Sequence, residues 1–322
     1  MKRALVLSGG GSKGAFEAGA IAYLLTEEKL DFHLFTGTSV GALNAAYLGQ
    51  ARNHQELQEL AEDLKNTWLT IKGNQDIYRG GILGTFWRVL FRGALYNPTG
   101  LWNLINQKID RERLFHRRTV VKIMVVSFET GKLCCVDSRE PKYRQDFLAY
   151  VLASASMPFF FPAVPIAGEH WYDGGLRDLT PLSAAIKENP DEIIVITTFP
   201  LSPDLEVILP PAKPGSALQA VLRTVDILLN EISANDLQLA QAINKAWWRY
   251  PGKRPIPIRI IVPTKPLPGN ALDFDPQKIR ANFLAGYEAA QNPRALAMTR
   301  FPAPAGHSLQ QPKPQISGKE AP

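Results

Sequence analysis

Residues 4–19, ALVLSGGGSKGAFEAG, run from an apolar strand through a glycine-rich loop into a helix. The run ALVLS has the continuous apolar character of a buried strand, and apolar residues recur at helical spacing over residues 15–27. The loop between them has the spacing Gly-x-Gly-x-x-Gly, which is the dinucleotide-binding fingerprint. Backbone N–H groups at the start of a helix bind many anions, so the loop predicts an anion site without identifying the anion.

Strands and helices alternate along the rest of the chain. A second strand, HLFTG, leads into a helix at 40–49, and further buried strands are predicted from VVKIMVVSF, EIIVITTF and PIRIIVP. Long helices are predicted at 216–248 and 276–290. A βαβα order is typical of a parallel sheet covered by helices on both faces. We therefore expect one α/β domain over residues 1–292 and a disordered tail at 293–322, where Pro, Ala, Gln and Ser show no periodicity.

The composition indicates a folded protein without a membrane span. The 322 residues are 45% hydrophobic and 20% charged, with a net charge of +6, which is ordinary for a globular protein. No apolar run reaches the length of a membrane helix, and the run after Lys2 and Arg3 is too short for a secretion signal. Adjacent Cys134 and Cys135 would point to opposite faces of a strand, so no disulfide framework is expected. We expect a cytoplasmic protein whose contact with membranes is at most peripheral.

The segment 73–99 mixes glycines, bulky aromatic residues and arginines in a way that a core helix seldom does. Basic residues outnumber acidic ones from Arg79 to Arg118, where Asp110 and Glu112 are the only acids. Such a stretch suits an anionic lipid surface, and it equally suits an ordinary solvated helix face. No recognisable nucleic-acid-binding module accompanies it, so nucleic acid is not an expected partner.

The strongest single motif is GTSVG at residues 37–41. It has the G-x-S-x-G spacing of a nucleophile elbow, where a strand turns sharply into a helix and exposes a strained serine, here Ser39. The strand HLFT precedes the motif and the helix at 40–49 follows it, as an elbow requires. Gly37 and Gly41 then leave room where side chains would collide with neighbouring strands. The alternative is a serine that caps a helix in a glycine-rich turn.

A serine nucleophile needs a base, and the chain lacks a histidine in the usual place. In α/β-hydrolases an acid and then a histidine follow the serine, but the only late histidine, His307, lies in the predicted tail. Asp173, in the sequence Asp-Gly-Gly, is the alternative base, because a carboxylate held against a serine hydroxyl can take its proton directly. Asp-Gly is also a common turn dipeptide, so a purely structural turn stays open. No His, Cys and carboxylate cluster has the spacing of a zinc site, and no metal is expected.

The glycine loop suits an oxyanion better than a nucleotide. A Rossmann site needs an acid at the end of the second strand, whereas the nearest acid, Asp31, precedes that strand. A P-loop needs Ser or Thr after its lysine, whereas Lys13 is followed by glycine. If the first two strands are neighbours, the loop lies beside Ser39 and its N–H groups can hold the oxyanion of a tetrahedral intermediate.

The predicted oxyanion site is the whole loop, with the N–H groups of Gly10, Gly11 and Ser12 as the donors. Lys13 adds a positive charge that points either toward the site or toward solvent. The residues assigned to this site are Gly9, Gly10, Gly11, Ser12, Lys13 and Gly14.

Four blocks, taken together and in this order, resemble the patatin-like phospholipase family. They are the glycine loop at 9–14, the elbow at 37–41, ASASMP at 153–158 and Asp-Gly-Gly at 173–175. The resemblance covers roughly residues 3–291 and implies a three-layer α/β/α fold with a mostly parallel central sheet. It further implies calcium-independent hydrolysis of lipid esters by a Ser39–Asp173 dyad, through an acyl-enzyme and without a cofactor. A peripheral lipid-binding module of the same fold, without turnover, is the alternative function.

Overall fold

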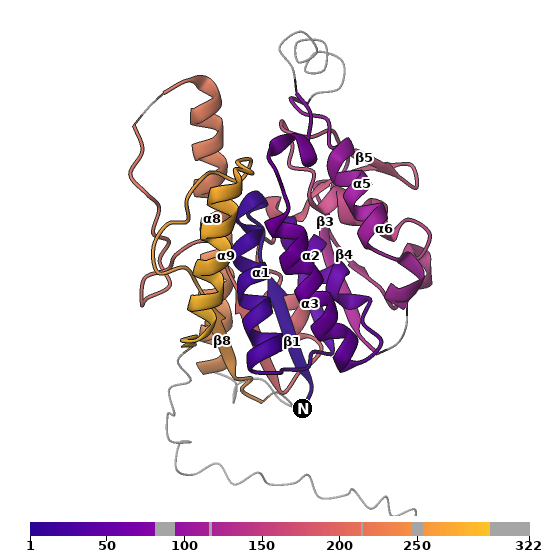
Figure 1. Ribbon diagram of the computed structural model, residues 1–322, viewed down its shortest axis with the longest axis vertical. Coiled ribbons are helices and arrows are strands. Elements are labelled where there is room, and N and C mark those ends of the chain that lie inside the picture. Colours follow the sequence, from indigo (N-terminus) through magenta and orange to yellow (C-terminus); the bar gives the residue numbers. More distant parts are fainter. Residues whose placement is uncertain (81–93, 116–117, 214, 246–253, 297–322) are drawn as a thin grey trace, which may run out of the picture.

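The computed structural model describes residues 1–80, 94–115, 118–213, 215–245 and 254–296 (Figure 1). Several sequence predictions fall wholly or partly outside these ranges. They are the centre of the glycine, aromatic and arginine segment, the last residues of the helix predicted at 216–248, and nearly all of the predicted tail.

A nine-stranded sheet forms the centre of the described structure, in the order β5-β6-β3-β2-β1-β7-β8-β9, with β4 paired to β3. The five strands from β3 to β8 are mutually parallel, and the outer pairs are antiparallel. The mostly parallel sheet predicted from the sequence is therefore confirmed. The strands are β1 (Arg3–Leu7), β2 (Leu34–Gly37), β3 (Val120–Ser127), β4 (Leu133–Asp137), β5 (Val164–Ile166), β6 (Glu169–Asp173), β7 (Glu192–Ile196), β8 (Ile258–Ile261) and β9 (Arg294–Ala295).

Helices cover both faces of this sheet. They are α1 (Gly14–Ala22), α2 (Val40–Gly49), α3 (His54–Leu69), α5 (Thr99–Lys108), α6 (Phe147–Ser154), α7 (Leu182–Ile186), α8 (Ala217–Lys245) and α9 (Pro276–Ala290). Local chemistry explains several of their ends. The Asn53 side chain accepts from the Glu56 N–H at the start of α3, and Asp275 caps α9 just before Pro276.

Two hydrophobic clusters on opposite sides of the sheet make up the three layers. Alternate residues of β1 belong to different clusters, with Leu5 and Leu7 in one and Ala4 and Val6 in the other. The first cluster includes residues of α1, α2, α3, α5, α6 and α9, and the second includes residues of α7 and α8. Figure 1 shows α9, α1 and α2 in front of the strands. The fold is the expected three-layer α/β/α arrangement.

Helices α1 and α9 approach so closely that their backbones touch. A Cβ on Gly19 would collide with the Phe283 carbonyl, and a Cβ on Gly286 would collide with the Phe16 carbonyl. Glycine at both positions therefore allows the close packing of α9 against α1. After α9 the chain adds β9, which pairs with β8 two residues beyond the domain end predicted at residue 292.

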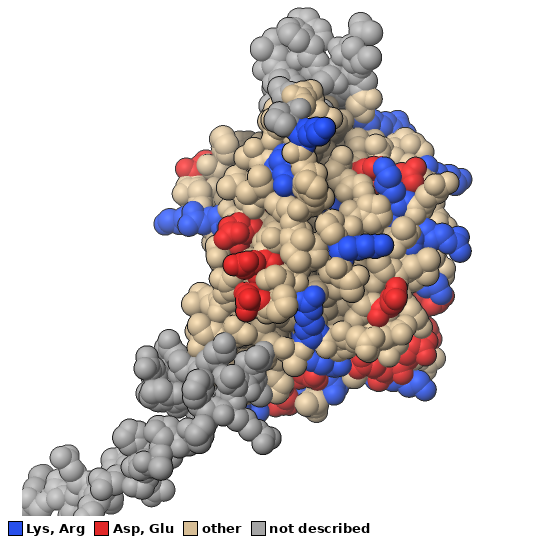
Figure 2. All heavy atoms as spheres, turned by 90° about the vertical axis from the view of Figure 1, so that its left-hand side faces the viewer, with Lys and Arg blue, Asp and Glu red and all other residues tan. Residues whose placement is uncertain are grey.

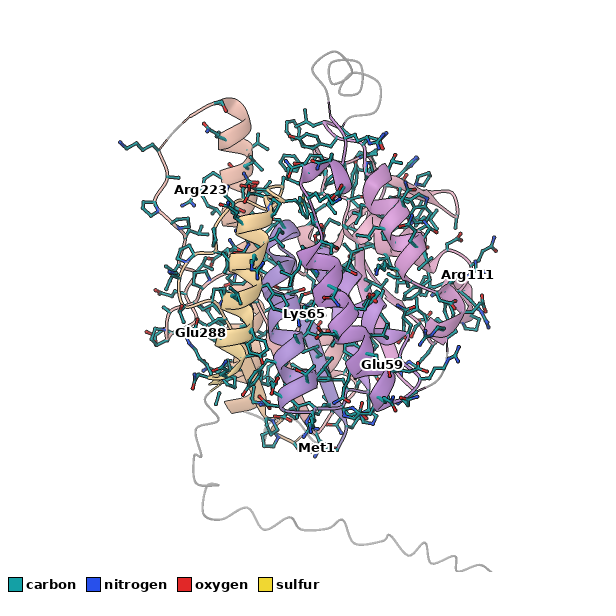
Figure 3. All side chains as sticks on the ribbon, viewed as in Figure 1. Met1, Glu59, Lys65, Arg111, Arg223 and Glu288 are labelled. Atoms are coloured by element: carbon teal, nitrogen blue, oxygen red, sulfur yellow. The ribbon has the colours of Figure 1, made fainter. Side chains whose placement is uncertain are left out.

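The outer surface carries dispersed charges. Figure 3 shows Glu59 and Lys65 on the outer side of α3, and Arg223 of α8 at the end of the molecule opposite Met1. On the side formed by α8 and α9, uncharged residues occupy most of the area and neither sign of charge covers it (Figure 2). Within the part of the chain that the structure describes, no helix is both long and apolar enough to cross a bilayer.

Candidate active site

The glycine loop and the GTSVG turn meet at the same edge of the sheet. Strands β1 and β2 are parallel neighbours, with Leu7 opposite Gly37, so the segments that follow them leave the sheet side by side. A Cβ on Gly9 would lie 3.0 Å from the Cβ of Ser39. The expectation that the first two strands are adjacent is confirmed, and it brings the loop against Ser39.

Ser39 has the backbone geometry of a nucleophile elbow. It lies between β2 and α2 with φ 57° and ψ −127°, a conformation that costs a non-glycine residue energy. A Cβ on Gly37 would collide with the Gly41 carbonyl, and a Cβ on Gly41 would collide with carbonyls at the end of β1. Ser39 occupies the N-cap position of α2, but its side chain makes no capping hydrogen bond. The alternative of a helix-capping serine is therefore wrong, and the hydroxyl is available for other contacts.

The Ser39 backbone is held by Ser154 of α6. The Ser39 N–H donates to Ser154 Oγ at 3.0 Å, and Ser154 Oγ donates to the Met124 carbonyl at 2.7 Å. Ser154 thus connects the elbow to β3 through a buried side chain. The site residues predicted from the sequence did not include it, although it belongs to the ASASMP block, which was the available signal.

Asp173 lies at the end of β6 and is 1% exposed. Its Oδ1 accepts from the Gly175 N–H at 2.8 Å, and its own N–H donates to the Ser156 carbonyl at 3.0 Å. Among the described residues, its Oδ2 has no hydrogen-bond partner. A Cβ on Gly174 would collide with the Met124 carbonyl, so the Asp-Gly-Gly backbone packs directly on β3. The turn is therefore structural, and it also leaves one buried carboxylate oxygen free.

Burial raises the pKa of Asp173 to about 7, while the Gly175 N–H and the Ser39 hydroxyl act in the opposite direction. Ser39 and Asp173 line the same pocket. No hydrogen bond joins the two side chains, so the geometry that relates them is the pocket that they share. A carboxyl with a pKa near 7 can accept and return a proton at neutral pH, which suits a general base.

Most N–H groups of the glycine loop are already used. The Gly9 N–H donates to the Leu179 carbonyl at 3.2 Å, and the Ser12 N–H donates to the Ala271 carbonyl at 2.8 Å. The N–H groups of Lys13 and Gly14 donate to carbonyls within the loop. Ser12 was one of the three predicted oxyanion donors, and its N–H is not available because residue 271, far along the chain, occupies it.

The N–H groups of Gly10 and Gly11 have no acceptor among the residues that the structure describes. A Cβ on Gly10 would collide with the Thr198 side chain, and a Cβ on Gly11 would collide with the Ala271 carbonyl. Thr198 also donates its hydroxyl to the Gly9 carbonyl at 2.6 Å. Thr198 and Ala271, neither of which the sequence singled out, therefore fix the loop with two free donors.

Two pockets meet at Ser39. One, of about 830 Å³ including its open mouth, is mainly apolar and passes between α2, α3 and α5. The other, of about 710 Å³, contains Asp173 and polar groups from the loop and α8: Lys13, Asp226 and Asn230. Burial raises the pKa of Asp226, and the nearby Lys13 partly offsets this effect. Lys13 lines this pocket and so faces the site, one of the two orientations that the sequence left open.

Within the described ranges, no group of three or more His, Cys, Asp or Glu side chains is arranged to hold a metal ion. The residues at the site offer a hydroxyl, a carboxylate and backbone N–H groups. This donor set is typical of acyl transfer by hydrolases that use an oxyanion site.

Fold and site together define a three-layer α/β protein with a strained Gly-x-Ser-x-Gly turn between a strand and a helix. A family model described as patatin-like phospholipase matches residues 5–186, more than half of the chain, and the protein belongs to that family. The resemblance predicted from the four sequence blocks is confirmed. Membership supports hydrolysis of lipid acyl esters as the general class of activity.

Individual relatives add little detail. The chain is 26% identical over 302 residues to the uncharacterized protein YjjU of Escherichia coli, covering 88% of this chain and 74% of YjjU. It is 37% identical over 106 residues to the triacylglycerol lipase SDP1L of Arabidopsis thaliana, covering 33% of this chain and 12% of the lipase. Among solved structures, VipD from Legionella pneumophila aligns with a TM-score of 0.45 and 14% identity, over 90% of this chain and 66% of VipD.

Proposed function

We propose that the protein is a serine hydrolase of lipid esters that uses Ser39 as nucleophile, Asp173 as base and the N–H groups of Gly10 and Gly11 as oxyanion donors. The observation that carries the proposal is the position of Ser39. Its strained backbone leaves the hydroxyl without a capping role, in a pocket shared with a buried carboxylate that has one unpartnered oxygen.

In the first half of the reaction, Asp173 accepts the Ser39 hydroxyl proton while Oγ attacks the ester carbonyl carbon. The carbonyl electron pair moves onto oxygen, and the resulting oxyanion accepts hydrogen bonds from Gly10 and Gly11. Collapse of the intermediate breaks the bond to the alcohol oxygen, which leaves with the proton held by Asp173. The product that stays behind is an acyl-enzyme on Ser39.

In the second half, water loses a proton to Asp173 and attacks the acyl carbonyl carbon. The same N–H groups hold the second oxyanion, and its collapse breaks the bond to Oγ. Ser39 recovers its proton from Asp173, and the fatty acid leaves. One carboxyl serves both steps, because a pKa near 7 lets it exist in either protonation state at neutral pH.

The two pockets suit the two parts of a lipid ester. The apolar pocket would take the acyl chain, and the pocket with Lys13, Asp226 and Asn230 would take the alcohol part. We also propose that the enzyme meets its substrate as a peripheral protein at a lipid surface. The exposed apolar side chains of Phe128, which follows β3, and Leu176, which follows Asp173 by three residues, support this contact.

The test compares the wild-type protein with Ser39→Ala on short-chain nitrophenyl esters and on a panel of lipids, with products identified by mass. We expect the substitution to lower kcat on the order of 10³-fold or more, because it removes the nucleophile. Ser183→Ala, at an exposed serine of α7, is the matched control and should keep full activity. Wild-type activity in Ser39→Ala would refute the assignment, and lack of turnover by the wild type would favour the lipid-binding module.

A further inference from the structure

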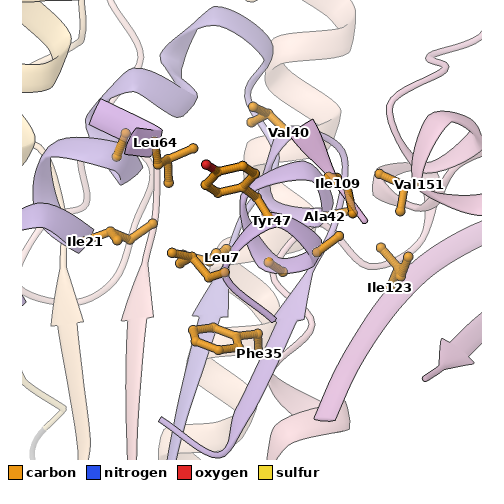
Figure 4. Packing of buried hydrophobic residues seen from close by; sticks show 14 of the residues in the cluster. Leu7, Ile21, Phe35, Val40, Ala42, Tyr47, Leu64, Ile109, Ile123 and Val151 are labelled. Atoms are coloured by element: carbon orange, nitrogen blue, oxygen red, sulfur yellow. The ribbon is translucent and has the colours of Figure 1, made fainter. Parts of the chain in front are cut away.

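The apolar pocket extends from Ser39 along about two turns of each of three helices, α2, α3 and α5. On α2 its lining residues are Val40, Leu43, Asn44 and Tyr47, which are spaced i, i+3, i+4 and i+7 and so share one helix face. The pocket is also lined at the same spacing by residues 64–68 of α3 with Ile71 just after that helix, and by residues 101–108 of α5. Figure 4 shows Val40, Tyr47 and Leu64 close together in this region. The pocket is therefore elongated along α2, with Ser39 at one end.

A polar group closes the other end. The Tyr47 hydroxyl donates to Asp63 Oδ2, and Lys108 Nζ lies 3.0 Å from the same oxygen. Tyr47 is 6% exposed, whereas the side chains of Lys108 and Asp63 are 36% and 47% exposed. Burial raises the pKa of Asp63, but hydrogen bonds from Tyr47 and Lys108 outweigh it and keep the carboxylate ionised at neutral pH.

The same group also borders the solvent side. A surface hollow lined by Asp63 and Lys108 borders the apolar pocket and shares five of its lining residues: Thr67, Ile71, Ile77, Leu104 and Lys108. Tyr47, Asp63 and Lys108, called here the end plug, thus separate the interior pocket from the outside. An acyl chain that reached the plug would have to displace an ion pair and a tyrosine hydrogen bond to extend further, which is costly for an apolar group.

The spacing along α2 sets the usable length. Tyr47 lies eight residues after Ser39, about 12 Å along a helix with a rise of about 1.5 Å per residue. An extended hydrocarbon advances about 1.25 Å per C–C bond of about 1.52 Å at a near-tetrahedral angle. We propose, on the basis of the hydrolase function above, that the end plug limits the acyl chain and that the substrates are esters of medium-chain acids of about eight to ten carbons.

The first experiment measures kcat/KM on nitrophenyl esters with acyl chains from four to sixteen carbons. Each buried methylene should raise kcat/KM about fourfold until the pocket is filled. We expect the wild-type series to rise to about eight to ten carbons and then to level off or fall. The chain length at which kcat/KM stops rising is called here the break. Lys108→Ala and Tyr47→Ala should move the break to longer chains, and Leu43→Trp should move it to shorter ones.

Tyr287→Ala is the matched control. Tyr287 also donates a hydrogen bond to a carboxylate, Glu27, but on the surface and outside the pocket, so its break should not move. Lys108→Ala keeps the proposal testable if Tyr47→Ala fails to fold, because Lys108 is partly exposed and its removal leaves no core cavity. The end plug is overturned if Lys108→Ala and Leu43→Trp keep the same break as the wild type. It is also overturned if kcat/KM of the wild type rises without a break to sixteen carbons. Both outcomes leave the hydrolase function intact.

The second experiment does not depend on catalysis. Calorimetry on Ser39→Ala measures the binding of fatty acids of eight, ten and sixteen carbons, with and without Lys108→Ala. We expect the ten-carbon acid to bind more tightly than the sixteen-carbon acid, and Lys108→Ala to reduce or reverse this preference. If no ester is hydrolysed by the wild type but this binding pattern is found, the hydrolase proposal fails and the end plug stands. Equal binding of all three acids overturns the end plug.

Discussion

Replacing Asp173 by asparagine tests the effect of this buried carboxyl on stability together with its effect on catalysis. Asparagine has nearly the same shape, and its Oδ1 can still accept from the Gly175 N–H, but it cannot ionise or act as a base. Any property that depends on the Asp173 proton should therefore differ between the wild type and Asp173→Asn in a pH-dependent way. The substitution should abolish ester hydrolysis and yet make the folded protein more stable at neutral and alkaline pH.

The sign follows from the direction of the pKa shift. Burial raises the pKa of Asp173 from 3.8 to about 7, so between these values the folded state holds a proton that the unfolded state has lost. The proton on Asp173 stabilises the folded state fully below the unfolded pKa of 3.8. As pH rises from there, this contribution to the free energy of unfolding falls by about 1.4 kcal/mol per pH unit, and it is lost once the pH passes the folded pKa of about 7. From pH 5 to pH 8 the wild type should therefore lose about 3 kcal/mol relative to Asp173→Asn.

The same ionisation should control activity. Because only the carboxylate can take the Ser39 proton, kcat/KM of the wild type should rise about tenfold per pH unit below pH 7 and level off above it. The stabilising and catalytic effects thus have opposite pH dependences, with a common midpoint near 7. If Asp173 is the base, its burial costs stability in the pH range in which it becomes active.

The assay is urea unfolding of both proteins at pH 5, 6, 7 and 8, followed by the fluorescence of the six tryptophans, with ester hydrolysis measured in the same buffers. Burial also raises the pKa values of Asp178 and Asp236, to about 6 and about 7, so the wild-type curve alone is ambiguous. The difference between the two proteins cancels their contribution. A difference in unfolding free energy that stays constant from pH 5 to pH 8 would refute the reasoning, and so would wild-type activity that is flat over that range.

Two further predictions concern the elbow. Ser154→Ala removes the acceptor of the Ser39 N–H and the donor to the Met124 carbonyl, so the free energy of unfolding should fall by about 1 to 3 kcal/mol. Because the elbow backbone is then no longer held, we also expect kcat to fall by up to about a hundredfold with little change in KM. Steady-state kinetics checks this, and an unchanged kcat contradicts it. Gly41→Ala should cost more than about 3 kcal/mol or prevent folding, because its Cβ would collide with carbonyls at the end of β1. Gly131→Ala, at a positive φ in open space, should cost only about 1 to 2 kcal/mol, and equal urea midpoints for the two variants would contradict the elbow geometry.

The parts of the structure that depend on neighbouring residues in the chain could be predicted from the sequence. The helix predicted at 40–49 coincides with α2, and the strand HLFTG contains β2. The spacing of Gly37 and Gly41 around Ser39 has a steric cause, because a Cβ added at either glycine would collide with nearby backbone atoms. Local periodicity and short-range sterics are properties of a few consecutive residues, so they are visible without the fold.

Contacts between distant segments could not be predicted in this way. The sequence gives no sign that residue 271 accepts the hydrogen bond from Ser12, or that Ser154 holds the Ser39 N–H, because both depend on the packing of separate elements. The same is true of the end plug, where Tyr47, Asp63 and Lys108 come from three different helices. The short strand β9 also lies beyond the predicted domain end, since two residues have no periodicity to detect.

The C-terminal part of the chain has a specific role at the glycine loop. The Ala271 carbonyl takes the Ser12 N–H, and it lies just before α9, which packs on α1 through Gly19 and Gly286. Because α1 begins where the loop ends, the contact between α9 and α1 holds residue 271 against the loop. Residues well beyond the family match at 5–186 therefore decide which loop N–H groups stay free. If the oxyanion site is the pair at Gly10 and Gly11, its selection from the glycine-rich loop is a property of the whole fold and not of the loop sequence alone.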